Sequence, residues 1–222
     1  VNNEFGQSYA ENFADAASEN GIDIIADEVI DPADSGAPSG QMTNLVQANP
    51  DAILAVGLGG QASAFMTELG NAKAANPDFN PLVYMTATAA NPLFFGTLVE
   101  NGGSDGVYTS SNVKFVADEQ YATDEAVQTY LEAMATYAPD ANPADTSVLA
   151  GWLSMELAVH VAEQALAAGD LSRAGIMNAA RNIDYVPGLL IAGITASMNA
   201  DDAFYAEATQ LVRWDDATES FV

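Results

Sequence analysis

The sequence of 222 residues has no cysteine, a single histidine and only five lysine and arginine residues. The absence of cysteine excludes disulfide bonds, thiol catalysis and cysteine-ligated metals, and leaves the cellular compartment open. One histidine leaves few ways to build a catalytic triad. Thirty-one aspartate and glutamate residues give a net charge of −26, which repels nucleic acids and anionic membrane surfaces at long range. A nucleic-acid partner is therefore not expected.

A leader segment and a long uninterrupted apolar run are also missing. The start of the chain has no positively charged stretch followed by an apolar one, so we expect no signal peptide within this sequence. The most apolar long stretch, residues 148–168, carries Glu156, His160 and Glu163. Three such side chains argue against a membrane span. Hydrophobic residues still make up 49% of the chain, enough for a sizeable core in a globular protein.

The first half of the chain alternates between helix and strand patterns. Phe5, Tyr9, Phe13 and Ala17 recur every four residues and Gly21 follows as a stop, which predicts a helix. Further helices are predicted at 41–48, at 61–75 and, shorter, from Pro92; strands are predicted at 22–30, 52–56, 82–86 and 107–110, with a loop at 31–39. Strands separated by single helices imply a parallel sheet with right-handed crossovers.

The pattern changes after Ser111. Three helices are predicted at 123–137, 146–168 and 171–183, with little strand between them. Residues 207–214 and 219–222 flank Asp215 and Asp216 and predict a terminal hairpin. A helix-rich segment between strand-rich parts suggests that the chain crosses between two lobes.

A cluster of glycines follows the strand predicted at 52–56. Residues 57–62 read GLGGQA and fit the pattern G-x-G-x-x-A that a dinucleotide site needs after a strand. Three interpretations stay open: a dinucleotide site, a turn that lines a ligand cleft, and ordinary strand-to-helix geometry. A dinucleotide site also needs an acidic residue at the end of the next strand, and LVYMTAT ends without one.

The long apolar helix carries two patterns that could be read as sites. Glu156, His160 and Glu163 share one face and could form a metal trio, but a solvated helix face is the better interpretation in a chain so rich in carboxylates. Trp152, Met155 and Val159 lie at helical spacing, and we interpret them as core residues rather than as a ligand box. We predict no catalytic residue, no metal site and no cofactor.

Several segments together resemble a known family. VNNEFGQSYAENF, QANPDAILAVGLGGQASAFMTEL, PLVYMTATAANPLF and DGVYTSS follow in the order and spacing found in the second lobe of type I periplasmic binding proteins. The group that the sequence resembles is the amino-acid (Leu/Ile/Val-type) solute-binding proteins of ABC importers. The part from the Trp152 helix to VRWDDATESFV is similar to the segment that returns to the first lobe and then re-crosses.

This resemblance implies an α/β fold, with a parallel-sheet, three-layer, Rossmann-like lobe and a helix-rich segment from the other lobe. Residues 1–110 would form the second ligand-binding lobe without its first strand, 111–202 a segment of the first lobe, and 203–222 the return to the second lobe. The chain would then be a fragment that lacks most of the first lobe. We expect its helices between 113 and 200 to have an uncovered apolar face.

The resemblance also implies where a ligand would bind. Phe5 stands where the family often has an aromatic residue, Gly59 where many members carry a cleft side chain, and Thr86 about where amino-acid binders have the acid that pairs with the ligand ammonium. Glycine and threonine depart from that pattern and put a standard α-amino acid in doubt. The predicted ligand-binding residues are Phe5, Gly59, Gly60, Gln61, Thr86, Thr88 and Tyr108, and the predicted hinge residues are Ser110 and Ser111.

The function that the resemblance implies is capture of a small polar solute between two lobes, without a chemical step. The partners would be the solute and the membrane permease of an ABC transporter, in the periplasm or outside the cell, with a lipid anchor or secreted. The alternatives are a ligand-sensing domain of a receptor or regulator with the same fold, and a Rossmann-like nucleotide-dependent enzyme. A homodimer of this chain would cover the apolar faces.

Overall fold

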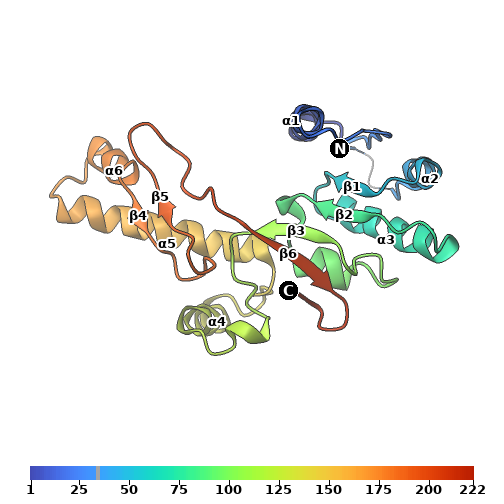
Figure 1. The fold of residues 1–222 in the computed structure, drawn as a ribbon. Helices are drawn as coiled ribbons and strands as arrows, with labels where there is room; N and C mark the ends of the chain where they lie inside the picture. Colours follow the sequence, from blue (N-terminus) through green and yellow to red (C-terminus); the bar gives the residue numbers. More distant parts are fainter. Residues whose placement is uncertain (34–35) are drawn as a thin grey trace. The chain divides into compact units, whose positions relative to one another are not determined.

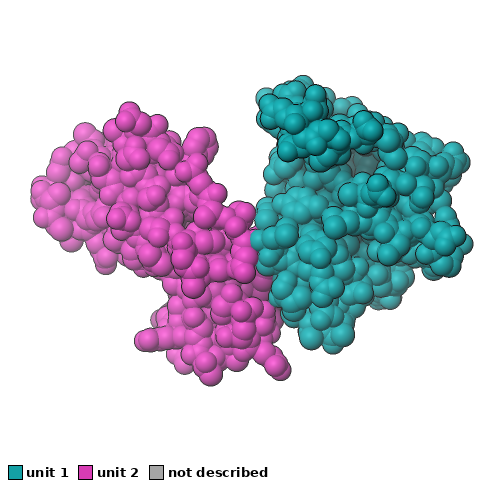
Figure 2. All heavy atoms as spheres, viewed as in Figure 1, with its two compact units in different colours: residues 1–110, 211–222 teal, residues 111–210 magenta. Residues whose placement is uncertain are grey.

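The computed structural model describes residues 1–33 and 36–222, which form two compact units. Unit 1 consists of residues 1–110 and 211–222, and unit 2 of residues 111–210 (Figure 2). Asp34 and Ser35, in the loop predicted at 31–39, lie outside the described residues. Unit 1 is thus assembled from two separate stretches of the chain, and its second stretch is the end of the sequence.

Unit 1 is an α/β unit built around one sheet (Figure 1). Its elements, in chain order, are α1 (Glu4–Asn20), α2 (Ser39–Ala48), β1 (Ala52–Ala55), α3 (Gly60–Ala75), β2 (Leu82–Met85), the short helical turns η1 (Ala87–Ala89) and η2 (Leu93–Thr97), β3 (Tyr108–Ser111), β6 (Gln210–Asp215) and β7 (Ser220–Phe221). The helices predicted in the first half all form, because each has a stop signal next to an apolar stripe. Asn3 Oδ1 caps α1 by accepting from the N–H of Gly6, and Gly21 ends it in the left-handed conformation.

The sheet has the strand order β1-β2-β3-β6-β7. β1 pairs with β2 in parallel, with Ala52 opposite Leu82, and β2 pairs with β3 in parallel, with Tyr84 opposite Tyr108. β6 and β7 form an antiparallel pair in which Trp214 lies opposite Phe221. The predicted parallel strands and the predicted terminal hairpin are therefore confirmed.

The strand predicted at 22–30 is wrong. These residues form no ladder with any other described residue, and Ile22, Ile24, Ile25 and Val29 are about half exposed. A strand exists only by pairing, so apolar residues of high β propensity are not sufficient without a neighbouring strand. The segment is held by a few contacts instead, such as the hydrogen bond from Gln41 Nε2 to the carbonyl of Val29 (2.9 Å).

The core of unit 1 packs aromatic side chains against the sheet. Trp214, Phe95 and Phe221 are at most 1% exposed and contact one another with ring centroids 4.9–5.6 Å apart. The indole N–H of Trp214 donates to Asp216 Oδ1 at 2.6 Å, which satisfies the polar end of a buried ring. This cluster joins the end of the sequence to residues 93–97.

Unit 2 is mainly helical (Figure 1). It contains η3 (Glu119–Tyr121), α4 (Glu125–Tyr137), α5 (Thr146–Ala167), α6 (Arg173–Ala180) and a small antiparallel pair, β4 (Asp184–Tyr185) with β5 (Ala196–Ser197), which the sequence patterns did not predict. Asp124, Asp145 and Ser172 cap the three helices through side-chain oxygens. The core is one cluster formed by Val116, Val127, Tyr130, Leu149, Leu153, Leu189, Leu190 and Ile194.

Much of the apolar surface of α5 and α6 is uncovered. Trp152 is partly buried against Tyr130 (ring centroids 5.3 Å apart), but Met155 is 65% and Val159 is 52% exposed. The interpretation of all three as core residues is therefore wrong for Met155 and Val159, because the core of unit 2 covers only one side of the helix. The expected uncovered apolar face is confirmed. In the described part of the chain, no helix is both long enough and apolar enough to cross a membrane.

Candidate functional site

The carboxyl ends of β1, β2 and β3 meet at one edge of the sheet in unit 1, because the three strands are parallel. In α/β folds this edge is where ligands bind. The residues that follow β1 are the glycine-rich loop and the first residues of α3, and those that follow β2 are Thr86 to Thr88. Ser110 and Ser111 form the end of β3. We call this set of residues, 55–61, 86–88 and 110–111, the carboxyl edge.

Glycine is required in the loop between β1 and α3. Gly59 has φ +49°, a left-handed conformation that L side chains rarely adopt. A Cβ at Gly57 would lie 3.3 Å from the backbone nitrogen of Ala62. The first turn of α3 is closed by hydrogen bonds from the N–H of Gln61 to Leu58 and from the N–H of Ala62 to Gly59 (both 3.0 Å). The loop therefore carries the chain directly from the strand end into the helix.

Hydrogen bonds link the residues after β2 to this loop. The Thr86 hydroxyl is fully buried and lies 3.1 Å from the Thr88 hydroxyl, which donates to the carbonyl of Gly57 at 3.4 Å. Thr88 itself is exposed. Gln61 Nε2 donates to the carbonyl of Asp31 at 3.4 Å. The structure thus brings Thr86, Thr88 and the glycine loop together.

Two tyrosines lie earlier in strands β2 and β3, before the carboxyl edge. Tyr108 lies opposite Tyr84 in the ladder, so both precede the carboxyl edge by about two residues. The Tyr84 hydroxyl is 3.0 Å from Ser110 Oγ. Tyr84 was not among the predicted site residues, although it precedes Thr86 by two residues and the alternation of a strand places both on one face.

Phe5 lies in the first turn of α1, where its ring contacts Tyr9 with centroids 5.0 Å apart. Val1 lies beside the carboxyl edge, since its amino group donates to the carbonyl of Val56 at 2.9 Å. Burial lowers the pKa of this amino group, and the nearby Asp27 carboxylate opposes that shift.

The predicted hinge residues stand where the two units divide. Ser110 is the last residue of the first stretch of unit 1, and Ser111 is the first residue of unit 2. Ser111 Oγ accepts from the N–H of Val113 at 3.2 Å. The assignment of the two units to the lobes of a binding protein, the ligand-binding set and the hinge remain predictions.

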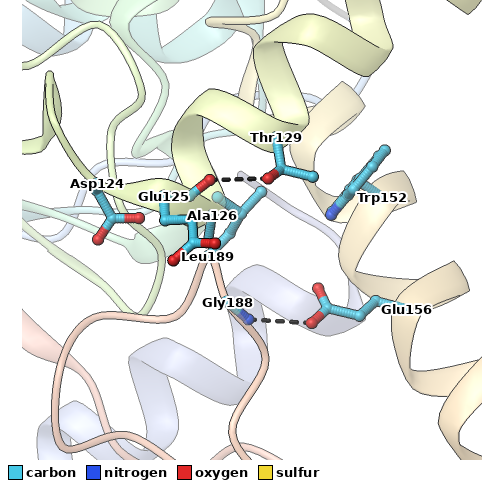
Figure 3. A pocket seen from close by; sticks show the side chains of 8 residues that line it. All are labelled: Asp124, Glu125, Ala126, Thr129, Trp152, Glu156, Gly188 and Leu189. Atoms are coloured by element: carbon cyan, nitrogen blue, oxygen red, sulfur yellow. Dashed lines mark hydrogen bonds between the residues drawn. The ribbon is translucent and has the colours of Figure 1, made fainter.

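Unit 2 contains a separate open cavity of about 480 Å³, which no sequence pattern predicted (Figure 3). The start of α4, the middle of α5 and the segment after β4 line it with Asp124, Glu125, Ala126, Thr129, Trp152, Glu156, Gly188 and Leu189. Glu156 Oε1 accepts from the N–H of Gly188 (3.0 Å) and from the Tyr185 hydroxyl (2.8 Å). The hydrogen bond between the Tyr185 hydroxyl and Glu156 is the main reason that the pKa of Tyr185 is raised to about 12.

The histidine beside this cavity is part of the packing. His160 stacks on Tyr185 with ring centroids 4.2 Å apart, and its Nε2 lies 3.0 Å from Gln164 Nε2. Within residues 1–33 and 36–222, no three His, Asp or Glu side chains are placed to hold a metal ion. The interpretation of this face as simply solvated needs correction for Glu156 and His160, because Tyr185 covers both.

Comparisons with known proteins extend these findings. The model of the periplasmic binding protein family matches residues 1–219. No protein with a curated description matches the chain.

Among solved structures, a fatty acid ABC transporter substrate-binding protein from Thermomonospora curvata is 21% identical, with a TM-score of 0.75 over 100% of this chain and 54% of its own. A branched-chain amino acid ABC transporter protein from Thermus thermophilus with bound valine is 13% identical, with a TM-score of 0.75 over 100% of this chain and 56% of its own. A solute-binding protein from R. palustris in complex with benzoate is 15% identical, with a TM-score of 0.69 over 98% of this chain and 54% of its own.

This chain therefore spans little more than half the length of those structures, and at these identities they show a common fold. The family match covers nearly the whole sequence, and the parallel sheet with its glycine-rich loop is the fold expected of one lobe. The chain belongs to the type I periplasmic binding protein family.

Proposed function

We propose that this chain is part of an extracytoplasmic solute-binding protein of an ABC importer, which captures a small polar solute such as an amino acid, an amide or a related acid. The observation that carries the proposal is the family match over residues 1–219. The similar structures include substrate-binding proteins of ABC transporters. The partners are the solute and a membrane permease, and the protein acts in the periplasm or outside the cell.

The carboxyl edge of unit 1 supports this function. Hydroxyl groups, a side-chain amide and the N-terminus of α3 gather there, and these groups suit a small polar ligand. Gly59, Gly60, Gln61, Thr86 and Thr88 would contact the solute. Phe5 and Tyr108 would flank it.

Binding would use no chemical step. The carboxyl edge has hydroxyls that bond to one another and to backbone carbonyls, and general acid–base or nucleophilic catalysis needs an activating base next to such a hydroxyl. Ser110 and Ser111 would allow the units to rotate as the solute is enclosed. The division of the chain at these two residues supports that role.

The test is to denature the complete gene product and to identify the released small molecules by mass spectrometry. We expect a stoichiometric small solute that rebinds to the refolded protein and raises its Tm. Conversion of the solute by the protein would contradict a pure binding function. A protein that releases nothing, and whose Tm no small solute raises, would overturn the proposal.

A further inference from the structure

The carboxyl edge of unit 1 contains no side chain that carries a negative charge. Its side chains are the hydroxyls of Thr86, Thr88, Ser110 and Ser111 and the amide of Gln61, together with glycine and apolar residues. An ammonium group that leaves water needs an anionic partner or several free acceptors. The acceptors at this edge therefore decide whether unit 1 can hold an ammonium group.

The backbone acceptors at the edge already accept hydrogen bonds from the chain. Thr86 N–H donates to the carbonyl of Ala55 (3.2 Å) and Thr88 Oγ1 to that of Gly57 (3.4 Å). The carbonyls of Leu58, Gly59 and Thr86 accept from the N–H groups of Gln61, Ala62 and Ala89 at 2.9–3.0 Å. The carbonyls of Ala55, Gly57, Leu58 and Gly59 are thus all engaged.

The hydroxyls of Thr86, Thr88 and Ser110 are engaged in the same way. Thr86 Oγ1 is fully buried and bonds to Thr88 Oγ1, and Ser110 Oγ bonds to the Tyr84 hydroxyl. Hydroxyls can accept or donate, but a hydroxyl carries no charge with which to offset that of an ammonium group.

Among the described residues, Asp27 and Asp31 are carboxylates close to the edge, and both are exposed. Asp31 Oδ1 accepts from the N–H of Ala33 at 2.8 Å, and Asp27 interacts electrostatically with the amino group of Val1. Exposed carboxylates hold a cation weakly, because water and salt screen the pair.

We propose that the carboxyl edge selects a solute without an ammonium group, an acid or an amide rather than an α-amino acid. This inference rests on the proposed function and narrows it. Thr86 and Thr88 determine the specificity, because they occupy the end of β2 with hydroxyls instead of a carboxylate.

The experiment uses the complete gene product and solute pairs with the same carbon skeleton, with and without the amino group. Valine is paired with 3-methylbutanoate, leucine with 4-methylpentanoate, phenylalanine with 3-phenylpropanoate and glutamine with 4-carbamoylbutanoate. Binding is measured by thermal shift and then by calorimetry, together with identification of the solute released on denaturation. We expect at least one acid to bind at least tenfold more tightly than its amino acid, and a released solute without a basic nitrogen.

An amino acid that binds as tightly as its deaminated partner would overturn the inference while supporting the proposed function. A released solute that carries an ammonium group would do the same. If the protein binds neither member of any pair and releases no solute that rebinds, the proposed function fails and this inference fails with it.

Three variants test whether Thr88 determines the preference between an acid and its amino acid. Thr88→Glu places a carboxylate at the edge and should shift the ratio of the two Kd values at least tenfold toward the amino acid, whereas Thr88→Gln should not. Thr218→Glu adds the same charge at the turn between β6 and β7 and should leave the ratio unchanged. That turn follows Trp214, which bonds to Gly106 and Val107 at the opposite end of β3. Equal effects of Thr88→Glu and Thr218→Glu would overturn the assignment to Thr88.

Discussion

The core of unit 1 and the long helix α5 of unit 2 bury their apolar side chains to very different extents. In unit 1, Trp214, Phe95 and Phe221 are at most 1% exposed and lie against a five-stranded sheet. In unit 2, α5 buries Leu149 and Leu153, but its Met155 and Leu166 are 65% and 64% exposed. A sheet offers broad faces on which several elements can pack, whereas a helix in contact with one cluster covers only one stripe. The difference shows that apolar composition alone does not decide which residues form a core.

The largest expected effect is in the core of unit 1. Phe95→Ala removes a ring that contacts both Trp214 and Phe221, and it should lower the free energy of unfolding by about 3–5 kcal/mol. Phe204, in unit 2, is 73% exposed, and Phe204→Ala should change that free energy by less than about 0.5 kcal/mol. Urea titrations followed by circular dichroism would measure both. Similar losses would contradict the contrast between the core of unit 1 and the exposed surface of unit 2.

A smaller loss of stability is expected when the hydrogen bonds of Glu156 in unit 2 are removed. Glu156→Ala removes the acceptor of two donors, Gly188 N–H and Tyr185 O–H, and should cost about 1–3 kcal/mol. Tyr185→Phe removes one of these hydrogen bonds and should cost about 0.5–1.5 kcal/mol. If the two variants lower the free energy of unfolding equally, the hydrogen bond from Gly188 N–H to Glu156 contributes no stability.

The hydrogen bond between Tyr185 and Glu156 also predicts that the free energy of unfolding depends on pH. The folded pKa of Tyr185 is raised to about 12 by its hydrogen bond to Glu156, above the unfolded value of about 10. The stabilisation is therefore complete below about pH 10 and is lost as the pH rises through about 12. Glu156→Gln should lower the pKa of Tyr185, measured by ¹³C NMR of the phenol carbon with Tyr185→Phe for assignment. An unchanged pKa would mean that the charge of Glu156 has no part in the shift.

The cap of α4 should contribute about as much as one hydrogen bond. Asp124 Oδ1 accepts from Val127 N–H, and Oδ2 pairs with Lys114 Nζ at 2.7 Å. Asp124→Ala should cost about 1 kcal/mol, and Asp124→Asn less, because asparagine still caps. The Lys114 hydrogen bond lowers the pKa of Asp124, so this stabilisation is present above the unfolded pKa of about 4 and is lost as the pH falls through the folded value. Acid titrations in which wild type and Asp124→Asn lose stability in parallel would contradict this.

The smallest effect on folding is expected on the uncovered face of α5. Replacing Met155, Val159 and Leu166 by glutamine should change the free energy of unfolding by less than about 0.5 kcal/mol per residue, because these side chains bury little area. The same triple variant should convert a dimer of the 222-residue chain into a monomer in light scattering. A wild-type chain that is already monomeric would contradict the homodimer prediction.

Most helices of this protein could be predicted because their signals are local. Asn3 and Gly21 set the ends of α1, and Asn49 together with Pro50 ends α2 before β1 begins. The parallel sheet followed from the alternation of elements. The strand predicted at 22–30 could not be judged locally, because a strand depends on a partner elsewhere in the chain.

The position of the glycine-rich loop was predictable, but its hydrogen bonding was not. The glycine-rich sequence at 57–60 marks a strand end, yet the engagement of the Gly57 carbonyl by Thr88 is visible only in the fold. Likewise, the spacing of Glu156 and His160 placed them on one helix face, but Tyr185, some 29 residues from Glu156, determines what they do.

The sequence by itself determined the class of fold, the acidic character, the terminal hairpin and the family resemblance, since these depend on periodicity, composition and the order of short motifs. The tertiary structure decided which apolar residues are buried, which acceptors at the carboxyl edge are engaged and where the cavity of unit 2 lies. Burial and hydrogen bonding are properties of pairs of groups brought together from distant parts of the chain. A local pattern specifies what each group can do, and only the fold specifies which partner it meets.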